Sequence, residues 1–335
     1  MAEIEERLAQ FRQHFDTAQA EIAKVVVGQQ NVVSNTLVAL FANGHCLLEG
    51  VPGLGKTLLV RTLSDVLDLK YSRIQFTPDL MPADIIGTRI VMDGDDGKRR
   101  FEFQQGPLFG QVILADEVNR ATPKTQSALL EAMQERTVTV GREKHTLDEP
   151  FLVLATQNPL EMDGTYPLPE AQLDRFLFKV SVGFPSREEL SEVLGRTTDV
   201  NDTTVTRVLD GPMILAGQRL VREIVVAPHV RDYVTRLVLA THPEEKDAPD
   251  GIRRFVRYGS SPRGAQALLL GAKVKAALDS RFNVAFEDVR EMALPALRHR
   301  ILLNFEGEAD GHDPDDLVRE VLQHTPQMPS DAAVA

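Results

Sequence analysis

The feature that most constrains the fold is a glycine-rich loop at residues 50–57, which reads Gly, four residues, then Gly-Lys-Thr. This spacing is typical of a phosphate-binding loop. Its glycines let backbone N–H groups turn towards a phosphate, and the following helix adds its positive N-terminal end. Lys56 can reach the β- and γ-phosphates of a nucleotide, and Thr57 can offer a hydroxyl to Mg²⁺. The apolar strand expected before the loop and the helix expected after it favour this interpretation over a glycine-rich surface turn.

A pair of acids, Asp116 and Glu117, ends a second apolar stretch at 112–117. In nucleoside-triphosphate hydrolases, the first acid at such a strand end holds the metal and the second polarises the attacking water. The same pair could also cap a helix or lie on a solvated rim. Its position downstream of the phosphate loop favours the metal and water site.

Strands and helices alternate over residues 44–182, which predicts an α/β fold with a parallel sheet sandwiched by helices. The predicted first domain spans 1–185 and carries inserted β-hairpins near 89–103 and 137–147. Helical periodicity then predicts a small all-α lid domain over 186–306. Its expected helices lie at about 187–198, 211–220, 228–241, 262–279 and 286–304. Residues expected to cap helix starts are Thr122, Ser186 and Ser261.

Composition and charge limit the environment and the partners. No apolar run approaches the roughly 20 residues that a membrane-crossing helix needs, so we expect a cytoplasmic protein without an integral membrane segment. The net charge of −12 argues against nucleic acid as a partner. Cys46 is the only cysteine, which excludes an intrachain disulfide. The acidic tail at 307–335 is expected to be partly disordered, with one short helix near 314–322.

Three further motifs point to a family. They are Leu-Ala-Asp-Glu-Val-Asn-Arg at 114–120, Ala-Thr-Gln-Asn-Pro at 155–159, and the run from Gly-Thr-Tyr-Pro-Leu-Pro-Glu to Asp-Arg-Phe at 164–176. Together with the phosphate loop, they closely resemble MoxR-type AAA+ ATPases over roughly residues 5–305. The resemblance implies an AAA+ P-loop core followed by a helical lid, and Mg²⁺-dependent hydrolysis of ATP.

The resemblance also implies roles for individual residues. Lys56 and Thr57 match the phosphate and Mg²⁺ residues, Asp116 matches the metal-binding acid, and Glu117 matches the catalytic base. The expected sensor 1, arginine finger and sensor 2 are Asn158, Arg175 and Arg263, and a weaker match places Arg120 at a subunit interface. The remaining nucleotide-binding residues expected are Gly50, Pro52, Gly53, Leu54, Gly55 and Leu58, with Val27, Gly28 and Gln29 near adenine.

Two of these residues have simpler interpretations from the sequence alone, and a third does not. Asn158 could be a strand-end cap, since asparagine favours such positions. Arg175 could form a surface salt bridge with Asp174 or Glu170, which would contribute little energy. Arg263 lies at a helix start, where its charge is unfavourable to the helix dipole. This local conflict indicates a role for Arg263 outside its own helix.

The family resemblance implies a homo-oligomeric, hexameric ring in which Arg175 reaches a neighbour's nucleotide. Hydrolysis would move the lid and remodel a client protein, with von Willebrand factor A domain proteins as partners. One alternative is a chelatase-type motor subunit for metal insertion. Another is a non-hydrolysing ATP-dependent switch or scaffold, which the intact Asp116–Glu117 pair disfavours. A DNA-dependent motor is disfavoured by the net charge.

Overall fold

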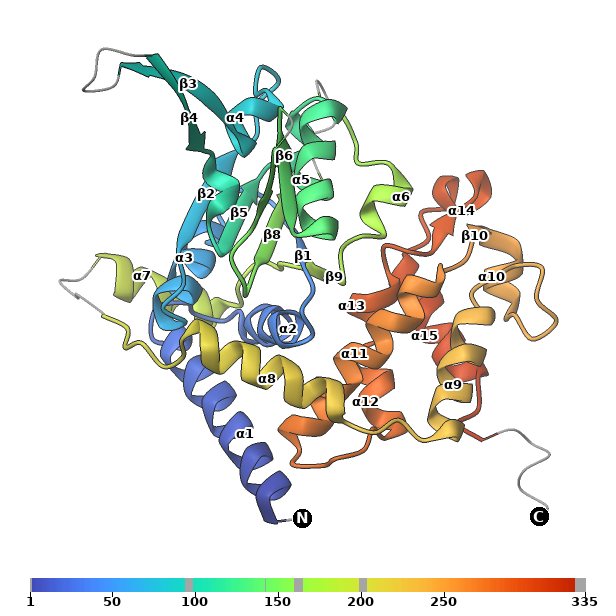
Figure 1. The fold of residues 1–335 in the computed structure, drawn as a ribbon. Coiled ribbons are helices and arrows are strands. Elements are labelled where there is room, and N and C mark those ends of the chain that lie inside the picture. The colour runs from blue at the N-terminus through green and yellow to red at the C-terminus, as the bar shows by residue number, and fades with distance from the viewer. Residues whose placement is uncertain (1, 94–98, 142, 160–164, 199–203, 329–335) are drawn as a thin grey trace.

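A five-stranded parallel sheet forms the centre of the N-terminal half of the chain (Figure 1). The computed structural model describes residues 2–93, 99–141, 143–159, 165–198 and 204–328. The strands, in their order across the sheet, are β2 (Tyr71–Gln75), β5 (Val112–Asp116), β8 (Leu152–Gln157), β1 (Cys46–Glu49) and β9 (Phe178–Ser181). All neighbours run parallel. The loops that follow β1, β5 and β8 therefore leave the same edge of the sheet, side by side.

Helices cover both faces of the sheet, as the alternation of strands and helices predicts. Along β5, Leu114 belongs to an apolar cluster with α1 (Ala2–Ala23), α2 (Gln30–Phe41) and α3 (Lys56–Val66). The adjacent Ile113 belongs instead to the cluster on the opposite face, which includes α4 (Pro82–Ile86) and α5 (Pro123–Glu135). Successive residues of a strand point to opposite faces, so a sheet covered on both sides needs apolar residues at every position.

Two antiparallel hairpins project from this core. The first pairs β3 (Gly87–Asp93) with β4 (Arg99–Gln105), and the second pairs β6 (Thr137–Val140) with β7 (Glu143–Thr146). An ion pair between Arg89 and Glu143 connects them. The hairpins expected near 89–103 and 137–147 are thus present, although the turn residues 94–97 and Arg142 lie outside the described residues.

All three residues expected to cap helices lie at helix starts, but only two of them make a capping hydrogen bond. Thr122 makes no capping hydrogen bond at the start of α5, where Pro123 occupies the first helical position. Proline needs no N–H partner there, which lowers the demand for a cap. Ser186 Oγ accepts the N–H of Glu189 at 3.2 Å, at the start of α7 (Arg187–Thr198). Ser261 Oγ likewise accepts the N–H of Arg263 at 3.1 Å.

The C-terminal half is mostly helical. Its further helices are α8 (Gly211–Glu223), α9 (Pro228–Leu239), α10 (Asp250–Phe255), α11 (Pro262–Leu278), α12 (Phe286–Glu291), α13 (Ala293–Leu297), α14 (Phe305–Ala309) and α15 (Pro314–His324). The single helix expected at 286–304 is wrong. It is divided at Met292, because Pro295 has no N–H to donate to the carbonyl of Glu291. A short strand β11 (Leu302–Leu303) follows and pairs with β10 (Val256–Tyr258).

The acidic stretch after residue 306 packs against the lid through α15. Leu317, Val318 and Val321 are buried, and Asp315 pairs with Arg298 at 2.7 Å. The acidic first turn of α15 suits the positive end of the helix dipole. A helix near the expected 314–322 is therefore present, while residues 329–335 of the expected disordered tail lie outside the described residues.

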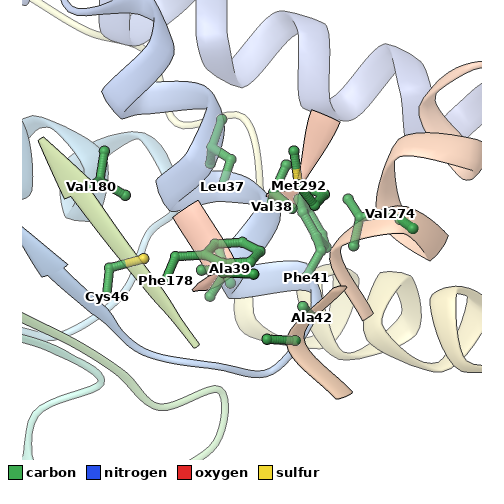
Figure 2. Packing of buried hydrophobic residues seen from close by; sticks show 14 of the residues in the cluster. Leu37, Val38, Ala39, Phe41, Ala42, Cys46, Phe178, Val180, Val274 and Met292 are labelled. Atoms are coloured by element: carbon green, nitrogen blue, oxygen red, sulfur yellow. The ribbon is translucent and has the colours of Figure 1, made fainter. Parts of the chain in front are cut away.

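The N-terminal helices and the lid helices share one apolar core. Figure 2 shows side chains of α2 between Phe178 of β9 and Val274 of α11. Helix α8 also packs beside α2 (Figure 1), where a β-carbon on Gly217 would lie 2.8 Å from the ring of Phe41. The lid is therefore bound to the sheet through α2 and α8. Within the described residues, no helix is long and apolar enough to cross a membrane.

Candidate active site

Residues from three adjacent strand ends meet at one edge of the sheet. The phosphate loop follows β1, the acids end β5, and Asn158 follows β8. They enclose a cavity of about 200 Å³ lined by Pro52, Gly53, Leu54, Gly55, Lys56, Thr57, Asp116, Glu117, Thr156 and Asn158. The parallel order β5–β8–β1 is the cause, since it places three carboxyl-terminal loops next to one another.

The phosphate loop has the backbone that its glycines allow. Gly53 and Gly55 have φ values of +86° and +76°, which residues with side chains rarely adopt. Lys56 Nζ folds back over the loop and donates to the carbonyls of Gly50 and Val51, the latter at 3.1 Å. Burial lowers the pKa of Lys56, and the carboxylates of Asp116 and Glu117 partly offset this effect. An anion in the cavity would likewise favour the charged ammonium.

Thr156, which the sequence analysis missed, connects the two acids. Its hydroxyl donates to Asp116 Oδ1 at 2.6 Å and accepts the backbone N–H of Glu117 at 2.8 Å. Glu117 has left-handed backbone angles, with φ 56° and ψ 50°. A non-glycine residue in this region is strained and persists where its surroundings fix it. Thr156 is part of what fixes the turn that presents the Glu117 carboxylate.

Two residues of β2 hold the carboxylates from the other side. Arg73 Nη2 lies 2.7 Å from Asp116 Oδ2, and Gln75 Nε2 donates to Glu117 Oε2 at 2.8 Å. Arg73 also donates to Gln75 Oε1 at 2.6 Å, which orients the amide. Arg120 Nη1 lies 3.2 Å from Glu117 Oε2. The sequence analysis missed Arg73 and Gln75. The sequence around them indicates only that their side chains point to the same face of β2, because they are two residues apart on a strand.

The expected adenine segment contacts the phosphate loop but does not line the 200 Å³ cavity. Gln29 Nε2 donates to the carbonyl of Leu54 at 2.6 Å. Gly28 has φ +74°, and a β-carbon there would lie 2.4 Å from Glu189 Cδ of α7. Val27 is half-buried, while the side chain of Leu58 is exposed and lies outside the cavity lining.

The two expected arginines lie elsewhere. Arg175 and Arg263 line a separate cavity of about 260 Å³, together with Asn43, Gly44, His45, Met133, Gln134, Arg136, Asp174, Leu177, Gln266, Leu270 and Arg300. Residues 43–45 precede β1, whereas the phosphate loop follows it. Gly44 and Gly50 are six positions apart along the chain on either side of β1, or roughly 20 Å at about 3.3 Å per residue. Neither arginine lines the cavity of its own chain's phosphate loop.

Comparison with known proteins agrees with this arrangement. Residues 45–178 match the model of the ATPase family associated with various cellular activities (AAA), and residues 252–321 match the AAA lid domain. The chain is 44% identical to the chaperone MoxR1 of Mycobacterium tuberculosis over 90% of its own length and 79% of that protein. It is 32% identical to the protein MoxR of Paracoccus denitrificans, over 90% of this chain and 92% of that one. A crystal structure from Cytophaga hutchinsonii is 41% identical with a TM-score of 0.89, covering 96% of this chain and 97% of the other.

Proposed function

The chain belongs to the MoxR family of AAA ATPases, and we propose that it hydrolyses ATP with Mg²⁺ at sites completed by a neighbouring copy in a ring. The observation that carries this proposal is the separation of the two halves of the machinery. Lys56, Asp116 and Glu117 line one cavity, while Arg175 and Arg263 line another beyond the opposite end of β1. A second copy that brings its arginines to the phosphate loop would join the halves.

The residues of the phosphate-loop cavity fit a magnesium nucleotide. Thr57 and Asp116 offer a hydroxyl and a carboxylate, the oxygen ligands that Mg²⁺ takes when phosphates and water supply the rest. Within the described part of the chain, no three His, Cys, Asp or Glu side chains group as a protein-only metal site. Bound Mg²⁺ would neutralise charge on the phosphate oxygens. Lys56 would contribute a second positive charge once its ammonium contacts phosphate rather than the loop carbonyls.

The protein's own part in the chemistry is orientation and proton acceptance. Glu117 would orient a water against the terminal phosphate and polarise it. Gln75 and Arg120 hold its carboxylate, and Thr156 holds its backbone. Asn158, which is buried at the cavity, would hydrogen-bond the water or the phosphate. Arg175 of the neighbour would stabilise charge that develops on the leaving oxygens.

We propose that this turnover drives remodelling of a client protein. MoxR1, which is 44% identical, is named a chaperone. On the basis of the family resemblance, we propose that the ring is a hexamer and that its partners are von Willebrand factor A domain proteins. Hydrolysis would move the lid helices relative to the sheet, and this conformational change would act on the client.

The test of hydrolysis is Glu117→Gln. We expect ATP binding to be retained, because Lys56 and the loop are unchanged, and turnover to be nearly abolished, because the amide cannot accept a proton. Binding is measured with a fluorescent ATP analogue and turnover by phosphate release. Glu131→Gln, on the exposed side of α5, is the control and should keep full turnover. Wild-type turnover in Glu117→Gln would remove Glu117 from this role.

The test of the shared site is to mix subunits. Arg175→Ala and Lys56→Ala should each be inactive, because each removes one half of every site. A mixture should recover turnover, because some interfaces then join an intact Lys56 to an intact Arg175. Mixing Arg175→Ala with the Lys56→Ala/Arg175→Ala double variant supplies no intact arginine and should recover nothing. If native mass spectrometry shows mixed rings that lack activity in the first mixture, the shared site is wrong.

A further inference from the structure

Asp174, the residue before Arg175, is connected to the lid through its carboxylate. Ser261 Oγ lies 2.9 Å from Asp174 Oδ1 and 2.8 Å from Oδ2, and Arg300 Nε donates to Oδ1 at 2.8 Å. Arg263 Nη1 lies 3.9 Å from Oδ2. The side chain of Asp174 is 20% exposed, so water competes only partly with these charge-assisted hydrogen bonds. All three partners belong to the lid.

Arg300 holds the backbone on both sides of Arg175. Its guanidinium donates to the carbonyls of Asp174 at 3.1 Å, Phe176 at 2.7 Å and Leu177 at 3.1 Å. The Arg300 side chain is 2% exposed. We call residues 174–177 the finger segment. A buried, planar guanidinium that serves four acceptors of one segment fixes that segment's position relative to α13, after which Arg300 lies.

Ser261 extends this connection to Arg263. The serine is the N-cap of α11, and its oxygen accepts the backbone N–H of Arg263 at 3.1 Å while its hydroxyl proton points to Asp174. One hydroxyl therefore lies between the carboxylate next to Arg175 and the backbone of Arg263. A part-buried network in which one carboxylate and one hydroxyl each serve several partners is stiff, since any shift breaks several bonds at once.

We propose that Asp174 is a positioning residue, which fastens Arg175 to the start of α11 so that Arg175 and Arg263 approach the neighbour's nucleotide as one unit. This inference rests on the shared site proposed above. The position of Arg175 then follows the lid of its own chain. Movement of one chain's lid changes catalysis at the next chain's phosphate loop.

The first variant is Asp174→Asn, which keeps the shape and removes the charge. We expect turnover to fall roughly ten- to hundredfold, because a displacement of Arg175 of about 1 Å has a cost of this order. ATP binding should be unchanged, since the phosphate loop lies at the other end of β1. The control is Asp315→Asn. Asp315 is 18% exposed and pairs with the lid residue Arg298 at 2.7 Å, away from the finger segment. It should keep turnover within about twofold of wild type.

Trans complementation separates positioning from general stability. Lys56→Ala subunits carry an intact Asp174 and Arg175, so adding them to Asp174→Asn should restore turnover. A defect in folding or in the chain's own phosphate site would not be restored. Recovery in the Arg175→Ala mixture but not in the Asp174→Asn mixture overturns this inference and leaves the shared site standing. Recovery in neither mixture overturns the shared site, and this inference with it.

A second pair of variants addresses the lid connection without changing the finger segment. Ser261→Ala removes the hydroxyl that Asp174 accepts, whereas Ser261→Thr retains it. We expect kcat to fall several-fold in Ser261→Ala with KM for ATP unchanged, and Ser261→Thr to restore kcat. Urea unfolding verifies that both variants are folded. Equal kcat in the alanine and threonine variants would show that the lid connection does not position Arg175.

Discussion

At the scale of single residues, the hydroxyl of Thr156 connects both acids of the candidate site. It is 1% exposed and serves both acids, one through its proton and one through its oxygen. Without this hydroxyl, the part-buried N–H of Glu117 would lose its partner in a strained turn. The arrangement explains why a threonine, rather than an apolar residue of equal size, stands next to the end of this buried strand.

We therefore expect Thr156→Val to lower the free energy of unfolding by about 1–3 kcal/mol, the usual cost of leaving a buried polar group unsatisfied. Turnover should also fall, because the Glu117 turn loses its support. Thr156→Ser keeps the hydroxyl and should lose less of both. Urea unfolding and phosphate release measure the two effects. A valine variant as stable and as active as the serine variant would contradict this role.

At the scale of single residues, the sequence predicted those whose signal is local. Lys56, Thr57, Asp116 and Glu117 lie in short patterns that carry their chemistry in their spacing. Arg73, Gln75 and Thr156 could not be found in this way. Their contacts with the acids require β2 and β8 to flank β5, and that strand order is set by long-range packing.

At the scale of elements, the connection between α1 and α2 is attached to the phosphate loop. Gln29 donates to Leu54, and Gly28 packs against Glu189 of α7 with a positive φ. Glu189 also accepts the N–H of Ser186 at 2.7 Å, as part of the cap of α7. A change at Gly28 therefore acts directly on Glu189 at the start of α7 and, through its neighbour Gln29, on the phosphate loop.

We expect Gly28→Ala to raise KM for ATP more than it lowers kcat, if residues 27–29 lie against adenine as proposed. The new β-carbon would also disturb Glu189, and the positive φ costs about 1 kcal/mol. Gly141→Ala is a matched control. Gly141 has φ +64° with open space around it, on the β6–β7 turn. It should lose similar stability and keep the KM of the wild type. Equal KM values in both variants would rule out the adenine contact.

The elements show what periodicity can and cannot predict. The strands and the long helices were predictable, because apolar spacing reports a buried face directly. The break between α12 and α13 had a visible cause in Pro295, yet the apolar pattern continues across it. The short α10, α14 and β10–β11 pairing had no such pattern, since they are held by tertiary contacts rather than by a face of their own.

At the scale of the whole molecule, two buried histidines make the free energy of unfolding depend on pH. His45 accepts the N–H of Val153 at Nδ1 and contacts the carbonyl of Met133 at Nε2. His299 contacts the carbonyl of Phe176. Burial, with Arg136 and Arg300 respectively adding to it, lowers the pKa of each well below its ordinary value. Both are therefore neutral in the folded protein at neutral pH.

Each histidine binds a proton more readily in the unfolded chain, so stability should fall as pH falls below about 6.5, the unfolded value. The expected loss is about 1 kcal/mol per histidine between pH 6.5 and 5.5. Urea unfolding at several pH values measures the slope. His45→Gln should reduce this slope whatever its effect on stability itself. His229→Gln, at an exposed position of α9, should leave it unchanged. Identical slopes in all three proteins would contradict the prediction.

The phosphate loop lies at one end of β1, and the arginines lie beyond the other end. The two surfaces that a copy would offer to its neighbours are therefore different. Under the proposed function, copies that join head to tail in an open row always leave the first loop without arginines and the last arginines without a nucleotide. Closing the row into a ring brings the arginines of the last copy to the phosphate loop of the first. Closure therefore adds one working site without adding a new kind of contact, so turnover per chain is expected to be higher in a closed ring than in an open row of the same number of copies.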